Sequence, residues 1–120
     1  MVGATTRTMG DTMTINQLEL ILWLQNWYQQ YCDGEWEHNE NITIHTIDNP
    51  GWHITIDLEG THFKDHSFEK IKEEKSQNDW FHCFVRNGKF EGAGGPCNLV
   101  NILYIFKNWA EHCQCHPSLN

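Results

Sequence analysis

This 120-residue chain lacks long apolar runs and has few basic residues. No stretch approaches the roughly 20 apolar residues of a membrane span. The opening MVGATTRTMGDTMT has no apolar block behind a charged region, so no secretory signal is expected. Lys and Arg number 8 against 16 Asp and Glu, which gives a formal net charge of -8. Because phosphate backbones are bound by clustered Lys and Arg, we expect no direct nucleic-acid binding and favour a basic partner.

The cysteines do not suggest a disulfide framework. There are 5, an odd number, and Cys32, Cys83 and Cys97 lie in unrelated sequence contexts. Reduced thiols are the simpler interpretation, and they predict a cytoplasmic protein.

The sequence also lacks the common signatures of catalysis. It has no Gly-x-Ser-x-Gly elbow, no phosphate-binding glycine loop and no His-Glu-x-x-His. His82 is not placed to activate Cys83, because neighbouring residues of a strand point to opposite faces. Cys32, although close to His38, is expected to pack at a helix end. Pairs of acids at i and i+2, as in EWE and DLE, occur by chance in so acidic a chain. We therefore predict that the protein is not an enzyme and needs no cofactor.

The sequence HCQCH, residues 112–116, places four potential metal ligands within five residues. Zinc sites usually join separated ligand pairs, and no second pair accompanies this one. On a helix, Cys113 would face the core and His112 would point away from it. We expect a helix end followed by a tail, residues 114–120, and no metal site.

Two amphipathic helices are predicted near the ends of the chain. The first begins at Thr14, in a capping box with Gln17, after a loose leader of residues 1–13, and it ends at Asp33-Gly34. Its apolar stripe comprises Leu20, Ile21, Leu24, Trp27, Tyr28 and Tyr31. The second is capped by Asn98 and finishes before Pro117. Its apolar face comprises Leu99, Ile102, Leu103, Phe106, Trp109, Ala110 and Cys113.

Strands are predicted between the helices. Ile42 and Ile44, then Ile54, Ile56 and Leu58, alternate with polar residues around the turn Asp48-Asn49-Pro50-Gly51, which indicates a hairpin. Residues 63–75 are compatible with a charged helix or an exposed edge strand, and they favour the strand, because Lys and Glu lie on both faces. Residues 80–85 predict a central strand, Asn87-Gly88 a tight turn, residues 89–91 a short strand, and GAGGP a break in regular structure.

The order of these elements predicts one domain over residues 14–113. We expect an α+β fold, an antiparallel sheet of four to five strands with the N-terminal and C-terminal helices packed on one face.

Four segments of the chain, in this order, are similar to a known family. They are LILWLQNWYQQYCDGEWEH, ITIHTIDNPGWHITIDLEGT, NDWFHCFVRNGKFEGAGGP and NLVNILYIFKNW. Together they resemble the immunity protein 53 family of bacterial polymorphic toxin systems, over roughly residues 20–109. The resemblance implies a small cytoplasmic protein that binds a toxin domain and blocks it, and that is not an enzyme. Many toxins of this class are nucleases with basic active sites, which an acidic inhibitor can occupy as a phosphate mimic.

A surface rich in acids and aromatics is the predicted contact with the toxin. Tryptophans are frequent anchors at interfaces, and acids steer a basic partner. We expect Trp36 and Trp52 to be anchors, and Trp27, Trp80 and Trp109 to belong to the core. The predicted partner-binding residues are Glu35, Trp36, Glu37, His38, Asp48, Trp52, Asp57 and Glu59. The alternative is a small-ligand or carbohydrate-binding domain, hydrolytic or not, with a pocket lined by Trp36, Trp52 and acids.

Overall fold

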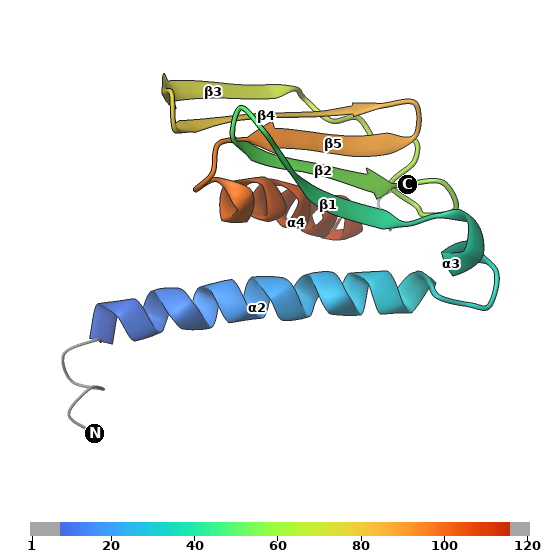
Figure 1. The fold of residues 1–120 in the computed structure, drawn as a ribbon. Coiled ribbons are helices and arrows are strands. Elements are labelled where there is room, and N and C mark those ends of the chain that lie inside the picture. The colour runs from blue at the N-terminus through green and yellow to red at the C-terminus, as the bar shows by residue number, and fades with distance from the viewer. Residues whose placement is uncertain (1–7, 116–120) are drawn as a thin grey trace.

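The fold is an antiparallel five-stranded sheet with helices on one side (Figure 1). In this computed structural model, residues 8–115 are described, with the side chains of residues 16–113. The sheet order is β1-β2-β5-β4-β3. The elements are α2 (Thr8–Tyr31), α3 (Trp36–Asn39), β1 (Ile42–Ile47), β2 (Gly51–Asp57), β3 (Ile71–Ser76), β4 (Asp79–Arg86), β5 (Lys89–Gly94) and α4 (Leu99–Cys115).

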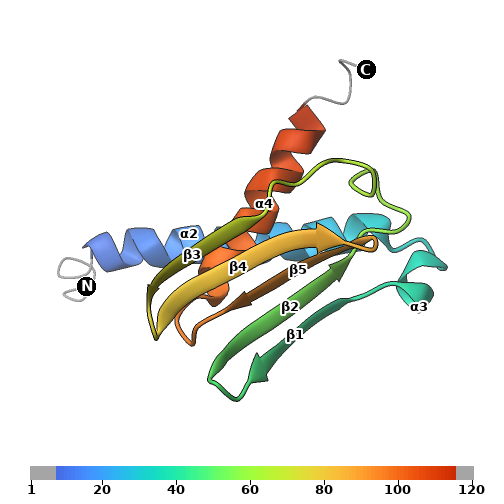
Figure 2. The same ribbon diagram turned by 90° about the horizontal axis from the view of Figure 1, so that it is seen from above.

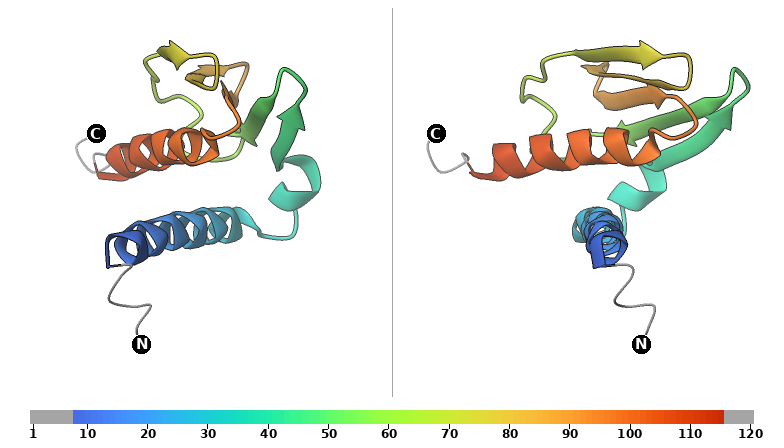
Figure 3. Two further views of the ribbon diagram at one scale, coloured as in Figure 1. Left: turned by 60° about the vertical axis from the view of Figure 1, so that its left-hand side comes forward. Right: turned by 90° about the vertical axis from the view of Figure 1, so that its left-hand side faces the viewer.

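The elements form three layers: the sheet, then α4, then α2 (Figures 1 and 3). Both long helices therefore lie on the same side of the sheet, and the predicted α+β class is confirmed. The opposite face of the sheet carries no helix among the described residues (Figure 2). No helix in residues 8–115 combines the length and apolar character that a membrane crossing requires.

The apolar side of α2 differs from the predicted stripe. Leu20 and Trp27 are buried as expected, but Ile21 is 49% exposed and Tyr28 is 38% exposed. Trp23 instead packs edge-on against Phe106 of α4, with ring centroids 5.8 Å apart. The helix also begins at Thr8, so the Thr14 capping box predicted from the sequence does not start it. The side chains that would form that box lie partly outside the described residues.

The first hairpin follows the prediction. β1 pairs with β2 across the turn at residues 48–50, with Ile44 opposite Ile54 and Ile42 opposite Ile56. Ile54 and Ile56 are fully buried on the side of the helices. The alternation of apolar and polar residues therefore identified both the strands and the buried face.

The second half of the sheet needs two corrections. β3 is an edge strand as predicted but begins only at Ile71. β4 is an interior strand as predicted, between β3 and β5, and β5 is the middle strand of the sheet. Gly92 and Gly94 continue β5 instead of ending it. A Cβ on Gly92 would lie 2.4 Å from Cγ2 of Ile102, so the glycine allows α4 to pack closely on the sheet. Asn87 and Gly88 both have positive φ, as the predicted tight turn requires.

The helix α4 buries the face that was predicted for it. Ile102, Leu103, Phe106, Ala110 and Cys113 are buried, whereas His112 is exposed.

Asn98 precedes α4, but its side chain joins the helix to the sheet. Its side-chain oxygen accepts the backbone N–H of Trp80 at 3.2 Å, and its amide donates to the Asp79 carboxylate at 3.1 Å. The predicted side-chain cap of Asn98 is therefore replaced by a link between the start of α4 and β4.

Candidate functional site

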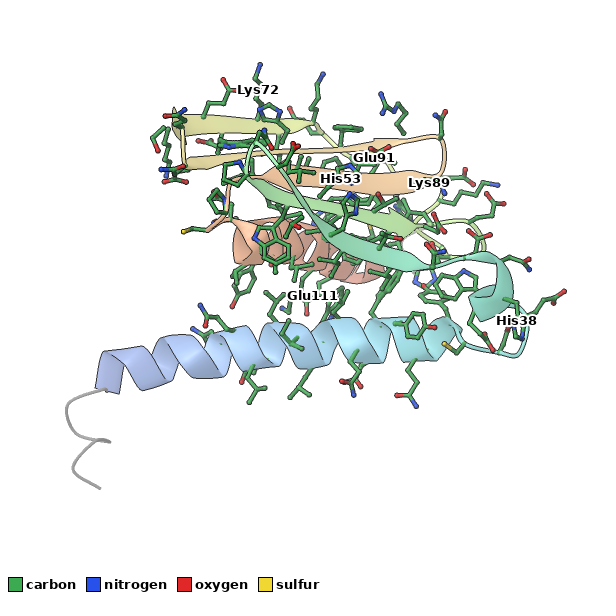
Figure 4. All side chains as sticks on the ribbon, in the orientation of Figure 1. His38, His53, Lys72, Lys89, Glu91 and Glu111 are labelled. Atoms are coloured by element: carbon green, nitrogen blue, oxygen red, sulfur yellow. The ribbon has the colours of Figure 1, made fainter. Side chains whose placement is uncertain are left out.

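The predicted partner-binding residues lie at two ends of the sheet. Strand β2 runs from Gly51 to Asp57, so Trp52 and Asp57 mark opposite ends of it. Asp48 belongs to the turn that precedes Gly51, on the side of Trp52. Residues 35–38, in and beside α3, and Glu59 belong to the other end, where Figure 4 labels His38 beside α3. The structure thus brings five of the predicted positions near Asp57 together and separates Asp48 and Trp52 from them.

Two acids shape the turn between α2 and α3. The Asp33 carboxylate accepts the backbone N–H groups of Glu35 and Trp36, both at 2.9 Å. The Glu37 carboxylate reaches back to the N–H groups of Asp33 and Gly34 at 3.0 and 2.9 Å. Hydrogen bonds from the backbone of Trp36 and Glu35 lower the pKa of Asp33. Glu37 therefore has a structural task, although it was predicted only as a contact residue.

Trp36 belongs to the core, and the expectation of an exposed anchor at this position is corrected. Its side chain is 8% exposed and packs edge-on against Trp27, with ring centroids 6.3 Å apart. Its indole N–H donates to the backbone oxygen of Glu59 at 2.8 Å. Gly60 fits against the ring, since a Cβ there would lie 2.9 Å from Trp36 Cδ1. A side chain held on all these sides joins α3 to the end of β2 and is not free to enter a partner.

Asp57 is also buried, at 5% exposure, and its carboxylate has two partners. Its carboxylate forms an ion pair with Lys89 and accepts the backbone N–H of Asn41 at 2.8 Å. The hydrogen bond with Asp57 raises the pKa of Lys89. Burial, followed by the charge of Asp57, raises the pKa of Glu40. Glu40 thus lies close to the ion pair of Asp57 and Lys89.

Around α3 lies a surface that we call the acidic end, formed by Asp33, Glu35, Glu40 and Glu59. These acids border a hollow of about 240 Å³, lined also by Trp36, Asn39 and Gly60. Lys64 pairs with Glu59 at 2.8 Å. The Glu35 carboxylate is exposed and has no hydrogen bond or ion pair within the described residues. The acidic end therefore has negative charge that the rest of the described chain does not neutralise.

The other end of β2 has a different character. Trp52 is half-buried and donates its indole N–H to the backbone oxygen of Pro96 at 3.0 Å. Asp48 is exposed on the turn. These two positions do not form a common pocket with Trp36.

Comparison with known proteins gives one match. A model of the family described as immunity protein 53 matches residues 21–111. The chain belongs to the immunity protein 53 family. No curated protein and no solved structure matches the chain. Membership gives this immunity protein its general function, which is immunity through binding of a toxin partner.

The sequence analysis missed the helix-free face of the sheet. His53, Lys89, Glu91 and Lys72 lie on it, on the side away from α4 (Figure 4). His53 Nε2 is 3.7 Å from Glu91 Oε1. On the same face, His82 Nε2 is 2.9 Å from a Glu74 carboxylate oxygen. Alternation within each predicted strand places such residues on one face, but which strands lie side by side is set by the sheet order, which the sequence did not predict. Glu91 also lies 3.5 Å from Arg86, and Lys89 pairs with Asp57, so several acids of this face have a basic partner on it.

The cysteines of this immunity protein fit structural roles. Cys83 is fully buried, and burial raises the pKa of its thiol to about 12. Such a thiol is a poor nucleophile at neutral pH. Cys32 donates weakly to the backbone oxygen of Tyr28 at 3.4 Å, as expected for a cysteine at a helix end.

The tail raised the question of a metal site. Among the residues whose side chains are described, no three His, Cys, Asp or Glu gather as they would around a metal ion. Cys115 and His116, two members of the HCQCH sequence, lie outside those residues.

Proposed function

We propose that this immunity protein neutralises a cognate bacterial toxin domain by covering its active site with the acidic end. The toxin is a nuclease, or another enzyme with a basic active site, and the carboxylates take the place of phosphates. The observation that carries the proposal is the cluster of incompletely neutralised acids around α3, on a chain of net charge -8. Opposite charges of this kind accelerate and orient association.

The geometry identifies which acids are available. Glu35 and Glu59 are exposed, whereas Asp33 and Glu37 hold the turn and Asp57 is paired with Lys89. We therefore assign the direct contacts to Glu35, Glu40 and Glu59, with His38 at the margin. Asp48 and Trp52 stand apart at the far end of β2 and would contact the toxin only through a second patch.

The alternative of a carbohydrate-binding pocket loses its basis. It required Trp36 and Trp52 to line one concavity with acids around them. Trp36 is buried and Trp52 lies at the opposite end of β2, so these two indoles cannot stack together on one sugar.

The test is co-expression with the toxin domain encoded next to this protein. We expect the wild type to restore growth and to co-purify with the toxin. The double variant Glu35→Lys/Glu59→Lys should weaken binding and slow association, most strongly at low salt. The matched control is Glu73→Lys/Glu74→Lys, which changes the net charge equally on β3, the edge of the sheet opposite β1. If the toxin kills cells that contain the wild type, and no complex forms, the proposal is wrong.

A further inference from the structure

The two edges of the sheet differ in how they are protected. The exposed edge β3 reads IKEEKS, and its charges discourage pairing with another strand. The other edge, β1, reads ITIHTI and contains no Lys, Arg, Asp, Glu or Pro. It has a partner strand on one side only (Figure 2). By the rules that govern sheet edges, β1 is an open position for a further strand.

The register shows which backbone groups face outward. The N–H of Asp57 donates to the oxygen of Asn41 at 3.1 Å, directly opposite it, and bonded pairs alternate along an antiparallel ladder. Thr43, His45 and Ile47 therefore bond to β2. Ile42, Ile44 and Thr46 direct their N–H and C=O groups away from it, toward the open edge.

Apolar side chains continue from this edge onto α2. The exposed large hydrophobic residues in the described part of the chain all belong to these two elements: Leu18, Ile21, Leu22, Tyr28 and Ile44. Ile44 is 40% exposed on the helix side of the sheet, because it pairs with the buried Ile54. Next to it, a hollow of about 370 Å³ is lined by Ile21, Leu24, Gln25, Tyr28, Asn41 and Ile42. Every second side chain of an added strand would face the helix side of the sheet, where this hollow lies beside Ile42.

The negative charge beside β1 indicates which kind of strand would bind there. The uncharged edge begins at Ile42, two residues after Glu40 of the acidic end. A strand on β1 would thus leave the sheet beside carboxylates. A Lys or Arg at that end would be attracted to them. A second copy of this acidic chain carries the same charge sign and is a poorer fit.

We propose that β1 binds an extended segment of the toxin as a sixth strand of the sheet. The segment has apolar side chains at alternate positions and Lys or Arg where it reaches the acidic end. This inference rests on the proposed function and specifies how the toxin is held. Backbone hydrogen bonds supply affinity, and the hollow beside α2 selects the side chains.

The experiment uses the full chain, the purified toxin domain and two pairs of matched variants. Thr46→Pro removes an outward N–H, whereas Thr46→Val retains it. Ile44→Lys places a charge on the helix side of β1, two residues from Ile42 of the hollow, whereas His45→Lys places the same charge on the opposite face. We expect Thr46→Pro and Ile44→Lys to weaken binding about tenfold or more, and both controls to stay within about threefold of the wild type. Circular dichroism checks that all four are folded.

Hydrogen exchange on the wild-type complex gives a readout without mutation. Protection of the amides of Ile42, Ile44 and Thr46 upon toxin binding is expected. If the wild type binds the toxin but these amides stay unprotected and both variants bind normally, the strand inference is wrong while the proposed function stands. If the wild type does not bind the toxin, the proposed function itself fails. If sedimentation shows a dimer that Ile44→Lys dissociates, with toxin binding intact, β1 pairs with a second copy and the inference is also overturned.

Discussion

Replacement of Trp36 by phenylalanine separates a core residue from an interface anchor. The indole N–H donates to the Glu59 oxygen at 2.8 Å, and a net hydrogen bond of this kind is worth about 0.5–1.5 kcal/mol. The phenyl ring also leaves part of the space beside Trp27 and Gly60 empty, and full truncation of a buried tryptophan costs about 3–5 kcal/mol. We therefore expect Trp36→Phe to lower the free energy of unfolding by about 1–3 kcal/mol.

Thermal unfolding and toxin binding together measure this prediction. At this chain length the melting temperature should fall by about 3–6 °C for each kcal/mol. The Kd for the toxin, measured well below the melting temperature, should stay within about threefold of the wild-type value. Trp109→Phe is the matched control for the loss of an indole hydrogen bond, because the half-buried Trp109 also donates its indole N–H to a backbone oxygen, that of Ser67 at 2.9 Å. An unchanged melting temperature with a large loss of binding would mean that Trp36 meets the partner, and our assignment to the core would be refuted.

Two further predictions concern titration and thiol chemistry. The hydrogen bond with Asp57 raises the pKa of Lys89 in the folded protein. The pair should therefore stabilise the fold fully at a pH below the ordinary lysine pKa of about 10.4. This stabilisation should be lost as the pH rises through the higher pKa of the folded state. Melting curves between pH 8 and 11 should show a smaller alkaline loss for Lys89→Met than for the wild type, and equal losses would contradict the pairing. With Cys83 buried and its pKa about 12, and Cys97 exposed, a thiol reagent at pH 8 should label Cys97 in the folded protein and Cys83 only after unfolding. Mass spectrometry identifies the labelled peptide, and prompt labelling of Cys83 would contradict its burial.

Local signals in the sequence predicted much of the sheet. The turns at residues 48–51 and 87–88 fix two hairpins, because few residue types suit their backbone angles. The length of β5 was not predictable in this way. Its glycines suggest a loop locally, but Gly92 is required by the close approach of Ile102, which lies in another element. A glycine therefore predicts a loop from the local sequence, whereas in β5 it belongs to a strand on which a helix packs closely.

The sequence predicted which types of residue form the candidate site, but it did not predict which of their side chains are exposed. Its acids cluster in the sequence, and the structure places several of them around one hollow. Whether a given member is available depends on partners far along the chain. Asp57 is neutralised by Lys89, and Trp36 is enclosed by Trp27 and Gly60. No spacing rule connects these positions, so sequence reasoning could select the region but not the residues within it.

The helix α2 shows the same limit and links it to function. Apolar residues occur on two sides of this helix, and either side could have been the buried one. Packing of Trp23 and Trp27 against α4 decides the choice and leaves Ile21 and Tyr28 in the open. The same choice places that open side beside β1, the edge without charges. A protein that protects β3 with lysines and glutamates but leaves β1 unprotected beside exposed apolar groups has a reason to keep that edge free. The proposed pairing of a toxin strand with β1 would supply this reason, because an edge that is bound in the complex needs no charges to prevent other pairings.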